Sequence, residues 1–216
     1  MSNVINLSKG QTISLSKMPA IDLSKGGKGL QKVLVGLGWD PVTEQKTEKK
    51  GFLSSIFGSG SSSSREADID CDAFALGLKG GRLVNNDNLI YFGHLKNSDC
   101  SIKHTGDNLT GDGDGDDEQI IIDLSTVDAD SIVIGVNIYQ GKSRGQHFGK
   151  LQNAFIRIED MNTGIELCRY TLDSKYSDYV TVNFGTLVKN GNDWDFNATG
   201  EASNATSIGS FADNYK

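Results

Sequence analysis

The sequence has little of several features that would each point to a particular class of protein. It contains 216 residues but only two prolines, and its three cysteines, Cys71, Cys100 and Cys168, are an odd number without CxxC spacing. This usage argues against a disulfide framework and suits a reducing compartment. No apolar run approaches the roughly 18 residues of a membrane-spanning helix, and the first residues lack the apolar segment of a secretory signal. We therefore expect a cytoplasmic protein.

Positive charge and enzyme signatures are also scarce. The formal net charge is −7, which argues against nucleic acid as a partner because binding would need a basic face. None of the three histidines, His94, His104 and His147, stands in an HExxH spacing, and neither a GxSxG nor a GxxxxGK[ST] motif occurs. We interpret the histidines as structural or surface residues, and we expect neither catalysis nor a small-molecule substrate.

Short segments of strand length recur along the chain, separated by turn residues. The segment 33–39 is an apolar run of strand length, and the sequence KNGND at 189–193 is typical of a hairpin turn. Short helical turns are expected near 125–129 and 143–151. The predicted strands are 33–39, 67–78, 89–95, 119–124, 131–139, 154–159, 166–172, 179–188 and 194–198. Many strands and little helix predict an all-β fold, a β-sandwich of two mostly antiparallel sheets with a few short helical turns.

Two segments in the first third of the chain stand apart. A pattern ending in Leu-Ser-Lys occurs three times, at 5–9, 13–17 and 21–25, and predicts short antiparallel strands. Residues 41–65 are polar and Ser-rich, which indicates a flexible insertion in a single domain spanning 1–216. Within the insertion, GFLSSIF at 51–57 carries four large apolar side chains. It either contacts a partner or membrane, or folds back onto the body of the protein.

The strongest chemical signal is the sequence GDNLTGDGDGDDE at 106–118. No Lys or Arg occurs between Lys103 and Lys142, whereas that interval holds nine Asp or Glu. At a separation of about 5 Å in water, each pair of carboxylates costs roughly 0.8 kcal/mol, and more when buried. A hard cation would remove this repulsion. Oxygen ligands on a flexible, Gly-rich loop suit Ca²⁺ better than Mg²⁺, because Ca²⁺ accepts irregular geometry.

A second acidic cluster precedes this loop. Asp68, Asp70 and Asp72 alternate with apolar residues, so in a strand their side chains would share one face. Alone they fit either a solvated edge or a metal site, and the nearby acidic loop favours metal. An EF-hand is excluded: with Asp112 at its first position, the sixth would be Asp117 rather than Gly. The sequence therefore predicts an irregular Ca²⁺ site on a β scaffold.

Six motifs in a fixed order carry a resemblance to a known family. They are LSKG at 7–10, VGLGWD at 35–40, DIDCD at 68–72, HTGDNLTG at 104–111, GDGDDE at 113–118 and NAFIR at 153–157. With them the chain resembles the TerD domain of tellurium-resistance and bacterial stress proteins. The resemblance implies a β-sandwich that binds two Ca²⁺ ions. It also implies a cytoplasmic role in resistance to tellurite and other stresses, with no established catalysis.

The resemblance also implies a set of ligands and partners. Its motifs carry over to Asp68, Asp70, Asp107, Asn108, Asp116, Asp117 and Glu118, with Asp72, Asp112 and Asp114 as further candidates. The expected partners are other stress and tellurium-resistance proteins, some of them at the membrane. Two alternatives stay open: a constitutive scaffold with structural Ca²⁺ that docks partners or the inner membrane through 51–57, and a protein that binds or reduces a tellurium oxyanion. The negative charge disfavours the last.

Overall fold

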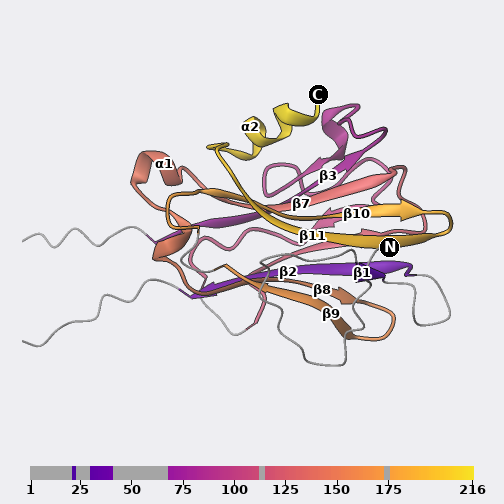
Figure 1. The fold of residues 1–216 in the computed structure, drawn as a ribbon, viewed down its shortest axis with the longest axis horizontal. Helices are drawn as coiled ribbons and strands as arrows, with labels where there is room; N and C mark the ends of the chain where they lie inside the picture. The colour runs from indigo at the N-terminus through magenta and orange to yellow at the C-terminus, as the bar shows by residue number, and fades with distance from the viewer. Residues whose placement is uncertain (1–20, 23–29, 41–67, 112–114, 173–175) are drawn as a thin grey trace, which may run out of the picture.

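The described residues form a sandwich of two antiparallel sheets. A computed structural model describes residues 21–22, 30–40, 68–111, 115–172 and 176–216. The first sheet has the order β1 (Ile21–Asp22), β11 (Asp193–Ser203), β10 (Thr181–Asn190), β7 (Ser131–Ile138), β3 (Cys71–Leu78) and β4 (Leu89–Ile90). The second has the order β5 (Ile102–His104), β6 (Glu118–Asp123), β2 (Lys32–Asp40), β8 (Gln152–Asp160) and β9 (Ile165–Thr171). Figure 1 shows the two sheets stacked face to face, which confirms the predicted fold class.

Helical structure is limited to short segments in the connections. The described residues include two α-helices of four and five residues, α1 (Gly141–Arg144) and α2 (Ile208–Ala212). They also include three single 3-10 turns, η1 (Asn86–Asn88), η2 (Phe148–Lys150) and η4 (Asp213–Tyr215). Within the described part of the chain, no helix is long and apolar enough to cross a membrane.

The core lies between the sheets and follows from the alternation of side chains along each strand. In β2, Val33, Val35 and Leu37 are fully buried, and Ile120 and Ile122 of β6 lie in the same cluster. Successive side chains of a strand point to opposite faces, so these residues cover one face of the second sheet. Burial alternates strictly along β5 and β6, whereas β2 is buried at five consecutive residues near its end.

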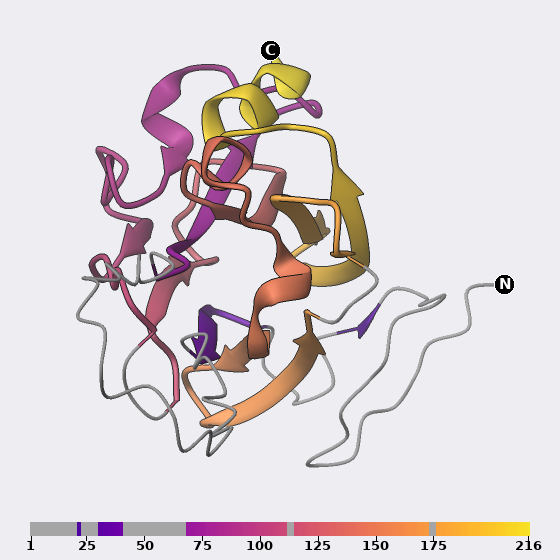
Figure 2. The same cartoon turned by 90° about the vertical axis from the view of Figure 1, so that its left-hand side faces the viewer.

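Strands β3 and β7 are buried on both faces. Their outer face forms a second apolar cluster in which Phe74, Leu76 and Val133 pack against Ile208 and Phe211 of the α2 segment. In Figure 2 the α2 ribbon lies over the outer side of the first sheet, beside the β3 ribbon. This cover explains why both strands have nearly continuous apolar sequences, as buried strands do.

The structure confirms most of the predicted strands and corrects others. The hairpin at 189–193 is present, because β10 ends at Asn190 and β11 begins at Asp193. The strand predicted at 67–78 begins only at Cys71, and that at 89–95 is reduced to the two residues of β4. Strand β5 and helix α2 were not predicted. Helical turns occur within 143–151. No helix forms at 125–129, where the N–H groups of Thr126 and Val127 bond the carbonyl of Asp123 in a turn.

Two predictions about the first third of the chain lie mainly outside the described residues. Of the repeats, only Ile21 and Asp22 of the third copy are described, and this pair forms β1 against β11, as a strand should. The first two copies, the insertion at 41–65 and its segment 51–57 fall outside the described ranges. Flexibility of the insertion and docking through 51–57 therefore stay predictions.

Candidate metal site

Glu118 joins the two sheets at the acidic edge of the sandwich. It is the first residue of β6 in the second sheet, and its side chain is fully buried. One carboxylate oxygen accepts a hydrogen bond of 2.7 Å from the backbone N–H of Ala73 in β3 of the first sheet. The other oxygen faces the backbone N–H of Asn108 at 3.4 Å. These bonds hold the acidic loop against the DIDCD segment, so the two segments form opposite sides of one site.

His104 lies against the same carboxylate. Its Nε2 is 3.3 Å from a carboxylate oxygen of Glu118, and neither side chain is exposed to solvent. Because the backbone N–H of Gly106 donates to Nδ1 of His104, the proton of a neutral imidazole is on Nε2, facing Glu118. Burial raises the pKa of Glu118, while His104 and the Ala73 N–H oppose that shift. His104 is therefore a structural partner of the site, consistent with its interpretation from the sequence.

Three carboxylates converge beside Glu118. Asp70 lies just before β3, Asp72 lies in β3, and both approach Asp107. One carboxylate oxygen of each residue lies within 4.8 Å of those of the other two. Asp70 and Asp72 are buried, with 8% and 1% of their surface exposed, whereas Asp107 is exposed. Alternation along the chain brings Asp70 and Asp72 together, as predicted. Asp68 lies before the strand, is exposed, and does not belong to this group.

Two of the three carboxylates lack the partners that buried charges need. Among the described residues, Asp70 Oδ1 and Asp72 Oδ2 are buried without a hydrogen-bond partner. Burial, followed by repulsion from Asp107 and Glu118, raises the pKa of Asp70 to about 6. Burial, followed by repulsion from Glu118, Asp70 and Asp107, raises the pKa of Asp72 to about 9. Buried carboxylates this close together would be stabilised by a cation.

The donor set fits a hard divalent cation. Every candidate donor is a carboxylate oxygen, the ligand type that Ca²⁺ and Mg²⁺ prefer, and no described Cys or His belongs to the group. Three carboxylates can supply three to six of the six to eight oxygens that surround Ca²⁺, since each binds through one or both oxygens. Asp70, Asp72 and Asp107 are therefore the residues that would hold an ion here.

Asp117 and Asn108 form the framework of the loop. The amide of Asn108 donates to Asp117 Oδ1 at 2.9 Å, and the backbone N–H of Trp39 donates to Asp117 Oδ2 at 2.9 Å. The side-chain oxygen of Asn108 accepts from the backbone N–H groups of Thr110 and Gly111. These contacts shape the segment that carries Asp107. The predicted roles of Asn108 and Asp117 as ligands stay predictions.

Asp116 is paired with a guanidinium group. Arg157 of β8 binds both its carboxylate oxygens, at 2.8 Å through Nε and 2.7 Å through Nη2, and Gln119 donates to it at 3.0 Å. A Cβ on Gly36 would lie only 2.3 Å from Asp116 Oδ1, so the close approach to β2 requires glycine there. Arg157 balances the charge of Asp116, which does not belong to the group formed by the three other aspartates. This ion pair was not predicted from the sequence, although Arg157 is part of the NAFIR motif.

The remaining predicted ligands can be placed briefly. Asp112 and Asp114 lie outside the described residues. The backbone carbonyl of Asp68 accepts a hydrogen bond from the Gln146 amide at 3.3 Å. Arg144 of α1 lowers the pKa of Asp70 against the larger effects that raise it, so a cationic side chain stands near the carboxylates. The sequence did not predict this neighbour, because Arg144 is 74 residues away in the chain.

Fold and site together define an antiparallel β-sandwich with a carboxylate-rich edge where its sheets meet. The chain belongs to the TerD domain family, whose model matches residues 4–215. It is 46% identical to the "Stress response protein SCP2" of Bacillus subtilis, over 91% of this chain and 95% of that protein. It is 40% identical to the "Tellurium resistance protein TerX" of Serratia marcescens, over 94% and 99%.

A solved structure shares the fold. It is the crystal structure of a homologue of telluride resistance protein (TerD) from Streptomyces coelicolor, which superposes with a TM-score of 0.60. The match covers 82% of this chain and 92% of that one, at 18% sequence identity. Identity this low supports the common fold alone.

Proposed function

We propose that this TerD-family protein serves in resistance to tellurium compounds and related stress, and that it binds Ca²⁺ through Asp70, Asp72 and Asp107. The names of its relatives support the first part. The second part rests on one observation: two buried carboxylates, each with an oxygen that has no hydrogen-bond partner in the described part of the chain, lie against a third carboxylate. When bound, Ca²⁺ would supply the positive charge that this group lacks.

The protein would act through a change of surface rather than through catalysis. Asp70 and Asp72 belong to the DIDCD segment, whereas Asp107 is on the loop that Glu118 and Asp117 hold. Joining them would fix the loop against the first sheet and remove repulsion among them. We propose that cytoplasmic partners, other stress and tellurium-resistance proteins, recognise the fixed arrangement. A second ion, near Asn108, Asp116 and Asp117, is part of the same proposal.

Calorimetric titration of EDTA-treated protein with Ca²⁺ tests the metal site. We expect saturable binding at micromolar concentrations, weaker binding of Mg²⁺, and a loss of at least about tenfold in affinity for Asp72→Asn, which keeps the shape of the side chain but removes the anionic ligand. Asp128→Asn is a matched control, because Asp128 is exposed and pairs with Lys79. Absence of Ca²⁺ binding, or equal losses in the two variants, would contradict the proposal.

A further inference from the structure

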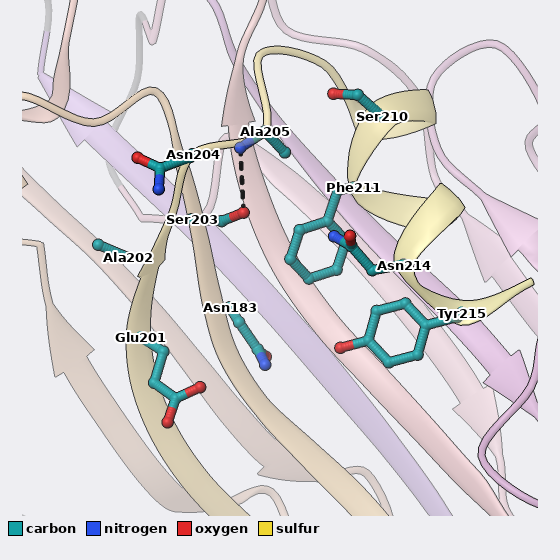
Figure 3. A pocket seen from close by; sticks show the side chains of 10 residues that line it. All are labelled: Asn183, Glu201, Ala202, Ser203, Asn204, Ala205, Ser210, Phe211, Asn214 and Tyr215. Atoms are coloured by element: carbon teal, nitrogen blue, oxygen red, sulfur yellow. Dashed lines mark hydrogen bonds between the residues drawn. The ribbon is translucent and has the colours of Figure 1, made fainter.

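A second polar pocket lies away from the carboxylate site. It is a cavity of about 490 Å³ between the ends of β10 and β11 and the segment formed by α2 and η4. Figure 3 shows it from close by. Asn183 and Glu201 are directly paired across β10 and β11, beside a bulge in β10 that follows Asn183. Phe211, Asn214 and Tyr215 line it from the helical side.

The walls of this pocket are held in place by contacts of their own. The backbone carbonyl of Tyr215 accepts a hydrogen bond of 2.6 Å from the N–H of Leu83. The ring of Phe211 packs on that of Phe74 with centroids 5.0 Å apart. Helix α2 is capped by Ser207 and Ser210, which bond each other's backbone N–H groups. The pocket is therefore formed before any ligand enters, which reduces the entropy lost on binding.

The pocket offers amide N–H groups, and it also offers two acceptors that a ligand could use, on Asn183 and Glu201. Asn183 Oδ1 is buried and has no hydrogen-bond partner among the described residues. In Figure 3 the Glu201 carboxylate and the Tyr215 hydroxyl point towards the Asn183 amide from opposite sides. The Ser203 and Ser210 hydroxyls, by contrast, are engaged within the wall, the first by the N–H of Ala205 and the second by the carbonyl of Ser207. A ligand that fits must bring N–H or O–H donors to Asn183 and Glu201.

Charge narrows the choice of ligand. Glu201 is the only charged side chain among the described lining residues, and the chain as a whole has a net charge of −7. Both disfavour an anion. Burial, followed by the Glu201 carboxylate, raises the pKa of Tyr215, so its hydroxyl stays protonated and its ring uncharged. The aromatic ring beside the carboxylate offers a face on which a planar cation can stack.

We propose that this pocket binds a guanidinium group, held by the Glu201 carboxylate and Asn183 Oδ1 and stacked beside Tyr215. A guanidinium has five N–H donors in one plane, so it can donate to both acceptors at once, whereas an ionised carboxylate ligand cannot donate to either. The group belongs either to a small free ligand or to an arginine side chain of a partner protein. This site is separate from the carboxylate cluster and does not depend on Ca²⁺ binding.

Agmatine, a small alkylguanidinium, is the first probe. We expect saturable chemical-shift changes at the side-chain amides of Asn183 and Asn214 when the full ¹⁵N-labelled chain is titrated with it. Glu201→Gln should weaken binding by about tenfold or more, since it removes the charged acceptor of a charge-assisted hydrogen bond. Asp128→Asn, which removes one exposed charge elsewhere, should bind as the parent protein does. Sodium acetate should cause no shifts at these amides.

Three results would overturn the proposal. The first is that no saturable shifts occur up to about 10 mM agmatine, a concentration that would largely fill a site with a Kd of 1 mM. The second is that Glu201→Gln and Asp128→Asn weaken agmatine binding equally. The third is that acetate shifts these amides as much as agmatine does. Glu201 is exposed and its side chain forms no hydrogen bond with the other described residues, so its variant should fold; an unchanged thermal melt checks this. The blocked peptide acetyl-Gly-Arg-Gly-amide then distinguishes the sources. Binding as tight as that of agmatine indicates an arginine of a partner, and much weaker binding indicates a free ligand.

Discussion

The Glu118 carboxylate accepts a 2.7 Å hydrogen bond from the backbone N–H of Ala73, and this contact joins β6 of one sheet to β3 of the other. The two residues are 45 positions apart, and the bond is buried. It fixes the distance between the DIDCD segment and the acidic loop. The carboxylate site therefore depends on a structural bond made by a residue next to the candidate ligands.

Replacing Glu118 should reduce stability strongly. Glu118→Ala leaves the N–H of Ala73 buried without its acceptor, and we expect a loss of about 2–4 kcal/mol in the free energy of unfolding. Glu118→Gln keeps an acceptor oxygen and should lose less. Urea denaturation in EDTA measures both, with exposed Glu201→Ala as a control expected within about 0.5 kcal/mol of the parent. Equal stability of Glu118→Ala and the parent would show that the bond contributes little.

The carboxylate site should make stability depend on pH. The pKa values of Asp70 and Asp72 are raised from 3.8 to about 6 and about 9, so the native state holds these protons more tightly than the unfolded chain. Their contribution to stability is greatest below about pH 4 and is lost as pH rises through 6 and then 9. We therefore expect these two groups to lower the melting temperature of the protein in EDTA as the pH rises from 6 to 9. Asp72→Asn should flatten the upper part of that fall.

The same pKa values predict that Ca²⁺ binding releases protons. Near pH 7 Asp72 holds its proton, and an ion that binds its carboxylate must displace it, so about one proton should leave per ion. Calorimetry in two buffers of different ionisation enthalpy measures that number. Affinity should rise between pH 6 and 9. An affinity independent of pH, with no proton release, would mean that Asp72 does not bind the ion.

The Arg157–Asp116 pair should show strong coupling. Their side chains are 15% and 3% exposed and form two hydrogen bonds, so removal of Arg157 leaves Asp116 largely buried without its counter-charge. Arg157 without Asp116 keeps its ion pair with Glu159 at 2.5 Å. We expect Arg157→Gln to lower the free energy of unfolding by about 3 kcal/mol. A double-mutant cycle with Asp116→Asn should give a coupling energy of at least about 1 kcal/mol. The exposed pair Lys79–Asp128, at 47% and 78% exposure, is the control and should couple by less than about 1 kcal/mol. Similar couplings would contradict this account.

Gly36 should not tolerate a side chain. A Cβ there would lie 2.3 Å from Asp116 Oδ1, so Gly36→Ala must displace the Asp116 carboxylate from Arg157. We expect a loss of about 1–3 kcal/mol, measured by urea denaturation. Gly209→Ala in α2 is the matched control, because the nearest atom to its Cβ would be 3.9 Å away. A helical Gly→Ala change should be neutral or stabilising by up to about 1 kcal/mol.

Local patterns in the sequence predicted the parts of the structure that local physics determines. Short apolar runs of strand length located β2, β6 and β8, and alternation placed Asp70 and Asp72 together. It did not hold for Asp68, which is not in the group: the backbone carbonyl of Asp70 still accepts a hydrogen bond from the N–H of Tyr139, just after β7, whereas Asp68 lies beyond that pairing. Helix α2 was missed because it has five residues and its capping partner is Ser210 rather than Glu or Gln.

Long-range contacts could not be predicted in the same way. The bonds from Glu118 to Ala73 and from Arg157 to Asp116 span 45 and 41 residues, and each depends on how the strands are ordered in the sheets. The sequence shows that Asp116, Asp117 and Glu118 are acidic, but their surroundings differ. Asp116 is paired with a guanidinium, Asp117 accepts from a backbone N–H of β2, and Glu118 is buried between the sheets.

These three consecutive side chains have a consequence for the motions of the acidic loop. Asp116 is tied to β8, Asp117 to Trp39 in β2, and Glu118 to β3, so the end of the loop is attached to both layers at once. It cannot swing away as a hinged flap without breaking contacts in each layer. The backbone amides of Asp117 and Ala73 should therefore exchange their hydrogens with deuterium as slowly as those of the central strands, and only through openings that disrupt the sandwich itself.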